Sequence, residues 1–368
     1  MLRKLFKFHG GVKPPTNKAH STTAPIASVP LPDRLVIPLH QSVGGHPRPL
    51  VQPGDQVFKG QRIGGADGNL SSAVHASTSG IVRDVLPAVM PHTSGLTTLS
   101  VVIEPDGEDR WGELDRINVR AATPDELRDY LRDAGVVGLG GAVFPSHLKL
   151  KPGKEGKLDT LVINGAECEP FITCDDMLMR ERATDMLKGI SAMRHMLQAR
   201  DVLIGIEDNK PEAIAAMREA AAPYSEIRIC PVPARYPMGS DRQLIVELTG
   251  KEVPSDSRAA DVGVIVHNVG TAYATAQAIY AGRPLVSRLM TLNGGAIASP
   301  GNYEVPIGTL VSDLIAFAGG YKDTATRLIM GGPMMGNVIP HARVPVVKGT
   351  AGILAFTAAE VAEEDSRA

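Results

Sequence analysis

The sequence predicts an α/β core flanked by two small β domains, and three patterns along the chain carry this prediction. Between residues 120 and 285, apolar strand-like runs alternate with helical segments, which is typical of an α/β domain with a mostly parallel sheet. Between 34 and 105, short β-branched runs separated by turn residues indicate a small all-β domain. Between 286 and 345, two hairpins and one crossing helix predict a β-grasp-like module.

Length, charge and hydropathy exclude several classes of protein. The 368 residues suffice for two to three domains at about 150 residues each. With 38 Lys and Arg against 40 Asp and Glu, the chain has no global basic field, so we expect no nucleic-acid partner. No run approaches the roughly 20 apolar residues of a membrane-spanning helix, and the start lacks the apolar core of a signal peptide. We therefore expect a cytosolic or peripheral protein without a direct membrane span.

The cysteines predict neither a disulfide framework nor a metal site. There are three of them, Cys168, Cys174 and Cys230, which is too few for a disulfide scaffold. None stands in the CxxC spacing of zinc or iron–sulfur ligands. Cys168 lies between two glutamates, so its pKa should be raised and its thiol should be a poor nucleophile.

Residues 1–33 form a basic arm. It contains no acidic residue before Asp33, and its cations are Arg3, Lys4, Lys7, Lys13 and Lys18. Two interpretations fit this pattern. One is a partly disordered arm, and the other is a strap onto an acidic partner or an anionic membrane surface.

The all-β domain at 34–105 resembles a barrel-sandwich hybrid, the architecture of biotinyl and lipoyl carriers. The likeness is in PGDQVFKGQRIG at 53–64 and VHASTSGIV at 74–82. A carrier needs a lysine at the exposed hairpin tip, but the tip from Gly65 to Val74 has none. We therefore expect a docking or spacer domain without covalent lipoylation or biotinylation.

The core at 120–285 begins with a helix whose start and stop are clear. Thr123 is the expected N-cap, Pro124 the first helical residue, Glu126 the partner in a capping box, and Gly135 the stop. Strands are predicted at 161–164, 201–206, 226–232 and 262–268, and helices near 176–197, 211–222 and 271–282. The β-grasp-like module follows at 286–345, and 346–368 are expected to form a tail.

A glycine-rich loop follows the first helix of the core. Gly138, Gly140 and Gly141 fall within four positions, and glycine lets consecutive backbone N–H groups converge on an anion. A following helix N-terminus adds positive potential. Lys149 can bring a point charge to a phosphate or to the pyrimidine edge of a flavin. The spacing is not GxGxxG, so a tight structural turn remains an alternative.

An acidic loop, NGAECEP at 164–170, leaves the carboxyl end of a predicted strand, where open α/β sheets bind ligands. Its acids and those just after it are Glu167, Glu169, Asp175 and Asp176. They suit either a solvated loop or acceptors of ribose hydroxyls. A phosphate on the adenosine ribose would be repelled by about 4 kcal/mol per charge at roughly 4 Å and an effective dielectric of about 20, which favours NAD(H) over NADP(H).

Two further loops and two aromatic rings belong to the same prediction. Phe144 and Phe171 suit stacking on an adenine or flavin ring, although core packing is the commoner use of phenylalanine. YPMGSD at 236–241 and HNVGT at 267–271 lie at expected loops of the same sheet. Each loop alone suits a structural role, and together the loops predict one polar, glycine-lined crevice. We expect His267 to be a satisfied histidine at a strand end, not a catalyst.

These loops resemble the C subunit of the Rnf ion-translocating electron-transport complex and, more distantly, the flavin-carrying, NADH-oxidising subunit of respiratory complex I. The likeness is carried by GLGGAVFP, NGAECEP, IGIEDNKPEA, YPMGSDRQL and HNVGTAYA, in the family's order. FHGGVKPPTNK, TGKEVP, SPGNYEVPIGT and MGGPMMG extend it to nearly the whole chain.

The resemblance implies an α/β flavin- and NADH-binding core with an N-terminal barrel-sandwich hybrid and a C-terminal β-grasp module of the SLBB type. It implies an FMN site made of Gly138, Gly140, Gly141, Lys149, Asn164, Glu167, Gly239, Asp241, Asn268 and Thr271. It implies NADH binding by Phe144, Glu169 and Phe171, with Glu169 toward the ribose. No side-chain catalyst is implied, because the cofactor carries the chemistry.

The resemblance also implies a cellular role. The chain would be a peripheral component at the cytoplasmic face of a bacterial inner membrane, with the other proteins of the complex as partners. FMN would accept hydride from NADH and pass electrons to iron–sulfur clusters, which links the NADH and ferredoxin pools. The alternative is a non-catalytic docking or adaptor protein without flavin. A sugar- or cobalamin-binding module built on the β-grasp part is less compatible with the acidic crevice.

The sequence departs from the family pattern in two places. Val143 replaces a glycine of the family's GGAGFPTG, and Ser146-His147 replace Thr-Gly, so a Cβ at 143 is expected to narrow the nucleotide channel. Relatives continue into a ferredoxin-like segment whose CxxCxxC motifs bind two 4Fe-4S clusters. No such motif is present here, so 346–368 are expected to lead toward an absent segment.

Overall fold

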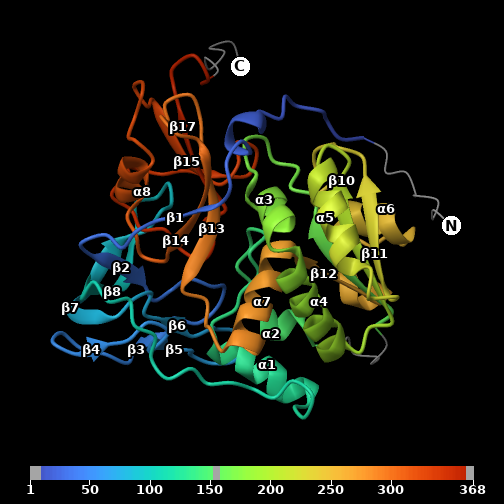
Figure 1. The fold of residues 1–368 in the computed structure, drawn as a ribbon, viewed down its shortest axis with the longest axis horizontal. Helices are drawn as coiled ribbons and strands as arrows, with labels where there is room; N and C mark the ends of the chain where they lie inside the picture. The colour runs from blue at the N-terminus through green and yellow to red at the C-terminus, as the bar shows by residue number, and fades with distance from the viewer. Residues whose placement is uncertain (1–9, 152–157, 362–368) are drawn as a thin grey trace.

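The computed structural model describes residues 10–151 and 158–361, which form three packed parts (Figure 1). The α/β core lies on the right of the view, the all-β domain at the lower left and the β-grasp module at the upper left. Within the described ranges, no helix combines the length and the apolarity needed to cross a bilayer.

The core contains a four-stranded parallel sheet in the order β11-β10-β9-β12. The strands are β9 (Thr160–Gly165), β10 (Asp201–Glu207), β11 (Ile227–Val232) and β12 (Val264–Asn268). Both faces of the sheet are covered. Leu161 and Ile163 pack into one apolar cluster, and Val162 between them packs into another. Covering on both sides explains why these strands read as continuous apolar runs.

Helices of the core cover the two faces unequally. One face carries α4 (Ala183–Leu197), α5 (Pro211–Ala221) and α7 (Val269–Ala281), with α3 (Cys174–Glu181) beside them. The other face carries α6 (Asp241–Thr249) and a short 3-10 turn at Ala259–Val262. The single helix expected near 176–197 is interrupted at Arg182. α6 was not predicted, although it begins after Ser240 and ends at Gly250 in the left-handed conformation.

The first core helix was predicted correctly from its capping residues. α1 (Pro124–Asp133) has Thr123 as N-cap, with the full capping box to Glu126. Gly135 then turns the chain at a φ of +70°. The chain continues through the glycine loop into the short helix α2 (Ser146–Lys149), so α1 anchors the start of that loop.

The all-β domain contains two antiparallel sheets. One has the order β2-β8-β7-β4, with β2 (Leu35–Pro38), β8 (Thr97–Pro105), β7 (Gly80–Val89) and β4 (Gln56–Val57); the other has β3 (Arg48–Pro49), β5 (Arg62–Gly65) and β6 (Val74–His75). Leu35 and Ile103 of this domain share one buried cluster with Leu127 and Leu131 of α1. The domain therefore packs directly on the core.

The β-grasp module is a six-stranded sheet with one helix. Its order is β1 (Ala27–Ser28), β14 (Gly301–Pro306), β13 (Ser287–Asn293), β17 (Gly352–Phe356), β15 (Arg327–Met330) and β16 (Asn337–Val338), and its helix is α8 (Val311–Phe317). Two strands come from outside 286–345. β1 belongs to the expected arm, and β17, in the expected tail, pairs with both β13 and β15. β1 and β17 join this sheet because they pair with strands far away in the sequence, and local sequence patterns do not predict such pairing.

The arm crosses the top of the molecule between the core and the β-grasp module (Figure 1). Val12 exchanges two backbone hydrogen bonds with Tyr236, at 2.8 and 2.9 Å, and the carbonyl of Thr16 accepts from the N–H of Phe171 at 2.8 Å. A 3-10 turn follows at Ala19–Ser21. From residue 10 onward, the arm is therefore a strap onto acidic and polar loops of its own chain. Arg3, Lys4 and Lys7 lie outside the described residues.

Candidate functional site

The sheet has a topological switch point between β9 and β12. β10 and β11 are added on one side of β9, whereas β12 is added on the other side. Loops that leave such a pair of strands diverge, and ligands of open α/β sheets bind in the resulting crevice at the carboxyl ends. Asn164 and Asn268 are register partners at this end. Two predicted site residues therefore lie next to each other at the expected place.

The glycine loop lies against the N-terminus of α7. The Leu139 N–H donates to Thr271 Oγ1 at 2.9 Å, and a Cβ on Gly140 would lie 3.1 Å from the Asn268 side chain. Gly141 has a φ of +120° and faces open space. Both glycines are exposed, and their N–H groups donate to no partner among the described residues. The loop therefore presents two free donors beside a helix N-terminus.

The opposite wall is built from the 236–241 loop and the acidic loop. Asn164 Nδ2 donates to the carbonyl of Gly239 at 2.7 Å, and the Gly239 N–H donates to Cys168 Sγ at 3.3 Å. Lys149 Nζ lies 3.2 Å from Asp241 Oδ2, which ties the helix after the glycine loop to this wall. These contacts bring the predicted loops together at one edge of the sheet.

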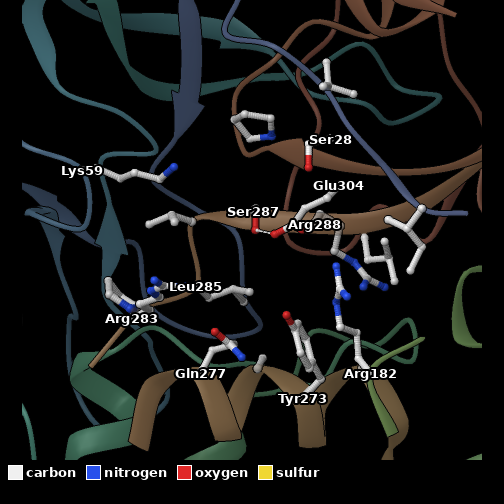
Figure 2. Close-up of a pocket in the computed structure, with 18 of the residues that line it drawn as sticks. Ser28, Lys59, Arg182, Tyr273, Gln277, Arg283, Leu285, Ser287, Arg288 and Glu304 are labelled. Carbon is white, nitrogen blue, oxygen red and sulfur yellow. Dashed lines mark hydrogen bonds between the residues drawn. The ribbon is translucent and has the colours of Figure 1, made fainter. Parts of the chain in front are cut away.

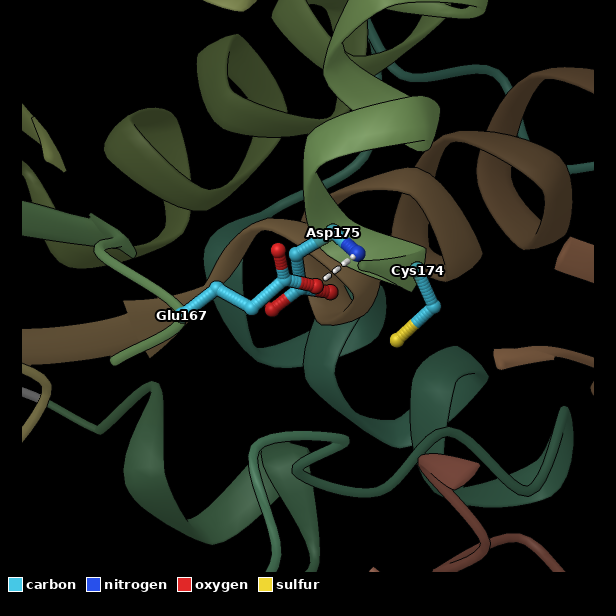
Figure 3. Close-up of side chains that lie close together, drawn as sticks. All are labelled: Glu167, Cys174 and Asp175. Atoms are coloured by element: carbon cyan, nitrogen blue, oxygen red, sulfur yellow. Dashed lines mark hydrogen bonds between the residues drawn. The ribbon is translucent and has the colours of Figure 1, made fainter. Parts of the chain in front are cut away.

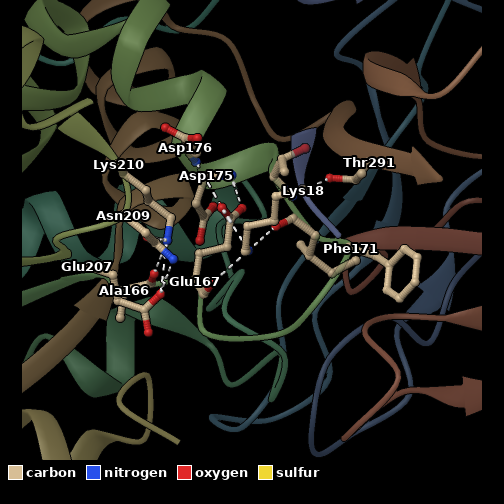
Figure 4. A network of polar contacts seen from close by, with 12 residues as sticks. Lys18, Ala166, Glu167, Phe171, Asp175, Asp176, Glu207, Asn209, Lys210 and Thr291 are labelled. Atoms are coloured by element: carbon tan, nitrogen blue, oxygen red, sulfur yellow. Dashed lines mark hydrogen bonds and ion pairs between the residues drawn. The ribbon is translucent and has the colours of Figure 1, made fainter. Parts of the chain in front are cut away.

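Glu167 lies in a buried charge network that includes the arm (Figure 4). Its carboxylate accepts from the Asp175 N–H at 2.6 Å and lies 3.6 Å from Lys18 Nζ. The Glu167 side chain is 3% exposed and that of Lys18 is 12% exposed. Burial raises the pKa of Glu167 to about 8, and the Lys18 ammonium opposes that rise. Burial also lowers the pKa of Lys18.

Two lysines that the sequence did not mark as site residues hold the backbone of the acidic loop. Lys18 Nζ donates to the carbonyl of Glu167 at 2.8 Å and to that of Ile172. From the other side, Lys210 Nζ donates to the carbonyl of Ala166 at 2.7 Å and pairs with Glu207 at 3.1 Å (Figure 4). Both lysines stand in the motifs FHGGVKPPTNK and IGIEDNKPEA, which were the only signal for them.

Asp175 connects the acidic loop to α7. Asn268 Nδ2 donates to its carboxylate at 2.6 Å, and Asn268 Oδ1 caps the helix by accepting from Gly270 at 2.8 Å. Glu167, Cys174 and Asp175 present their ligand atoms within 4.8 Å of one another (Figure 3). Burial raises the pKa of the Cys174 thiol well above its usual value and that of Glu167 to about 8, so neither group is largely ionised at neutral pH. We therefore assign no metal to this cluster.

The three residues expected to bind NADH, which are Phe144, Glu169 and Phe171, contact different parts of the structure. The backbone carbonyl of Phe144 closes the glycine loop by accepting from Gly138 at 2.8 Å. Glu169 accepts from the N–H of Met334 in the β-grasp module at 3.0 Å, and its Oε1 is buried without a partner in the described structure. The Phe171 ring packs on Phe356, with 5.0 Å between centroids. Glu169 and Phe171 thus contact the β-grasp module.

Two candidate catalysts are electrically neutral. Burial, together with the Lys149 charge, lowers the pKa of His267 well below its usual value. Its Nε2 is buried and has no partner among the described residues, so the histidine is not satisfied as expected. Burial raises the pKa of Cys168 to about 11, as expected for a poor nucleophile.

Three family models match successive parts of the chain. The RnfC barrel sandwich hybrid domain matches residues 6–108, the Nuo51 FMN-binding domain 131–277 and the SLBB domain 290–338. The C subunit of the ion-translocating oxidoreductase complex of Rhodobacter capsulatus is 47% identical over 360 residues, covering 97% of this chain and 69% of that protein. The chain belongs to the family of C subunits of ion-translocating oxidoreductase complexes. The predicted fold class and the resemblance to the Rnf family are therefore confirmed.

Other members of this family are longer. The Pseudomonas aeruginosa relative is 48% identical over 365 residues, covering 98% of this chain and 47% of its own length. Among solved structures, an NAD+-reducing NiFe hydrogenase in the H2-reduced state aligns with a TM-score of 0.55 and 22% identity, covering 65% of this chain and 48% of that one. The same type of hydrogenase in the air-oxidised state aligns with a TM-score of 0.55 and 21% identity, covering 68% of this chain and 53% of that one. At these identities the likeness shows the fold alone.

The residues at the switch point fit a flavin phosphate. The two free N–H donors at Gly140 and Gly141 and the α7 N-terminus favour an anion, and Lys149, on the helix after the loop, is paired with Asp241. A Cβ at Gly140 would push against Asn268, so this part of the loop needs glycine to stay in place. Val143 adopts a φ of +43°, a conformation that favours glycine, at the position where the family carries one.

Proposed function

We propose that the crevice at the β9–β12 switch point holds FMN and that this chain is the NADH-oxidising flavoprotein of a membrane electron-transport complex. The observation that carries the proposal is the free-donor glycine loop beside the α7 N-terminus, at the position where sheets of this topology bind ligands. When bound, FMN would supply acceptance of a hydride and release of single electrons.

In this proposal the protein residues bind and orient the cofactor. Gly138, Gly140 and Gly141 provide the backbone cradle, and Lys149 provides a positive charge near it. Thr271 and Asn268 keep the cradle against α7 through the contacts to Leu139 and Gly270. Asn164, Glu167, Gly239 and Asp241 complete the opposite wall. Donors held in advance bind a charged group without reorganising, which is the favourable arrangement for developing negative charge.

NADH would bind between the glycine loop and the β-grasp module. Phe144 would provide a stacking surface, and Glu169 has one carboxylate oxygen without a partner among the described residues, which suits a ribose hydroxyl. Phe171 would shape the same wall through its contact with Phe356. A Glu169 carboxylate beside the ribose would disfavour a phosphate there, so NADH is the proposed donor and NADPH is not.

The remaining parts of the proposal concern the assembly. Electrons would leave to 4Fe-4S clusters whose ligands lie outside this chain and would link the NADH and ferredoxin pools. Other proteins of the complex would hold this one as a peripheral component at the cytoplasmic face of the inner membrane. The names of the relatives, which describe subunits of ion-translocating oxidoreductase complexes, support this part.

An absorption spectrum of the purified protein tests the proposal. The two visible bands of an oxidised flavin should be present, NADH should bleach them, and NADPH should do so far more slowly. A protein that stays colourless after incubation with excess FMN would instead support the adaptor role. Equal bleaching by NADPH would leave flavin binding intact but contradict the assigned role of the acidic loop.

A further inference from the structure

We propose that a second pocket, next to the flavin crevice, binds a small organic bisphosphate. The pocket has a volume of about 660 Å³ and lies where the arm, the all-β domain, α7 and the start of β13 meet (Figure 2). None of the ten residues proposed to hold FMN lines it, although Leu139 of the glycine loop and Gly270 of α7 form part of its wall. The proposal therefore does not depend on the assignment of the flavin site.

Three arginines on the wall of the pocket have no acidic partner at ion-pair distance. Arg182, Arg283 and Arg288 line it, and none of them forms an ion pair within the described residues. Arg288 is 3% exposed, and its buried Nε has no partner there either. Its charge acts on Asp175, but that carboxylate lies outside the lining. Converging guanidinium groups without paired counter-charges repel one another, so an anion placed among them is stabilised.

The acidic residues on the same wall are already engaged. Asp109 pairs with Lys59 at 2.6 Å, and Asp185 pairs with Lys188 at 2.8 Å. Glu304 accepts from Ser287 Oγ at 3.0 Å (Figure 2). Two of the three carboxylates are thus neutralised within the protein, and the arginines remain as an excess of positive charge.

The cations stand at two separate places on the wall. Figure 2 shows Arg283 on one side of the pocket, beside Lys59, which is already paired with Asp109, and Arg182 and Arg288 on the other. Trp111 holds the first pair, because Lys59 Nζ and Arg283 Cζ lie 5.1 and 5.4 Å from its ring centroid. A ligand that satisfies both places needs negative groups at both of its ends.

Neutral polar groups lie between the two cationic places. Tyr273 and Gln277 point into the pocket from α7, and Ser28 faces them from the arm (Figure 2). Hydroxyl and amide groups of this kind suit the hydroxyls of a sugar or polyol. Guanidinium groups bind phosphate oxygens through paired hydrogen bonds. The volume falls in the range of about 300 to 1,000 Å³ for small-molecule sites, so a single inorganic phosphate would leave most of it unfilled.

Isothermal titration calorimetry of the full chain with fructose 1,6-bisphosphate, fructose 6-phosphate and inorganic phosphate tests the proposal. A charge-assisted hydrogen bond contributes about 1.5 to 3 kcal/mol, so the bisphosphate should bind at least about tenfold more tightly than the monophosphate. The sugar phosphates carry no base or nicotinamide, so they do not probe the proposed NADH cleft.

Two variants and a control make the result specific. Arg182→Gln and Arg283→Gln change exposed side chains on opposite sides of the pocket, and each should weaken binding of the bisphosphate by about tenfold or more. Arg200→Gln, an exposed arginine outside the pocket, should leave it unchanged. Thermal denaturation should verify that each variant folds. No binding of the bisphosphate at millimolar concentration, or unchanged affinity in both pocket variants, would overturn the proposal, and so would equal affinity for inorganic phosphate.

Discussion

Replacing Lys18 by methionine should destabilise the protein in a way that depends on pH. The ammonium lies 3.6 Å from the Glu167 carboxylate, and both groups are nearly buried. At an effective dielectric of about 20, this distance corresponds to an attraction of roughly 4 to 5 kcal/mol. Breaking a buried pair by removing one partner costs about 3 to 5 kcal/mol, because the other charge stays behind.

The sign of the pH dependence follows from the protonation of Glu167. Its folded pKa of about 8 lies above its ordinary value of 4.5, so the folded protein keeps this proton while the unfolded chain loses it. This group therefore costs stability progressively as the pH rises from 4.5 to 8. Without Lys18 the pKa rises further, and the loss of stability continues above about pH 8.

The loss in the free energy of unfolding caused by Lys18→Met should therefore be larger at pH 9 than at pH 6. At pH 6 Glu167 is protonated, and the variant loses only the amine's hydrogen bonds to two carbonyls, about 1 to 3 kcal/mol. At pH 9 the carboxylate is ionised in the wild type, whereas Glu167 of the variant, with its pKa raised further, keeps its proton. One pH unit above a pKa of about 8 corresponds to an additional loss of about 1.4 kcal/mol in the free energy of unfolding. Urea denaturation followed by circular dichroism at both pH values measures the difference.

Two further variants separate charge from packing. In a Glu167→Gln background, Lys18→Met should cost the same at both pH values, because no carboxylate remains. Lys188→Met, which removes an exposed pair with Asp185, should cost about 0 to 1 kcal/mol. An equal penalty for Lys18→Met at pH 6 and pH 9, with Glu167 present, would refute the reasoning.

Four other variants test separate parts of the structure. Gly189→Ala should lower the free energy of unfolding, measured in urea, by about 1 to 3 kcal/mol or more, because the new Cβ would lie 1.8 Å from a carbonyl oxygen of α7. This loss should exceed the gain of up to about 1 kcal/mol from the higher helix propensity of alanine. Unchanged stability would contradict the close packing of α4 on α7. Lys149→Ala should lower the amount of flavin that stays bound during purification. Lys151→Ala, which alters a neighbouring exposed lysine, should leave that amount unchanged. If both variants retain the same amount of flavin, Lys149 does not have the proposed role. Glu169→Ala should raise the KM for NADH more than it lowers flavin content, and Asp241→Ala should lower flavin content more than it raises the KM; the opposite pattern would reverse the assigned roles.

Local chemistry made much of the fold predictable. The Thr123–Glu126 capping box and Gly135 defined α1, because each acts on its immediate neighbours in the chain. Continuous apolar runs indicated the parallel sheet, since strands covered on both faces require them. Glycine spacing likewise marked the loop that lies against α7, because glycine at 140 permits the close approach to Asn268.

Contacts between distant segments were not predictable in the same way. β17 enters the middle of the β-grasp sheet from 346–368, which were expected to form a tail. Lys18 reads as one charge of a basic arm, yet its ammonium holds two carbonyls and a carboxylate about 150 positions further along the chain. Their partners are chosen by packing, which the local pattern does not encode.

The sequence by itself determined the order of the three domains, the strands and most helices of the core, and the loops at its carboxyl edge. Only the tertiary structure decided that Lys18 of the arm lies against Glu167 of the acidic loop, that the β-grasp module contacts Glu169 and Phe171, and that three arginines share a second pocket. The physical reason is that local conformation depends on neighbouring residues. The charge state of a buried group depends instead on whichever distant groups the fold packs against it.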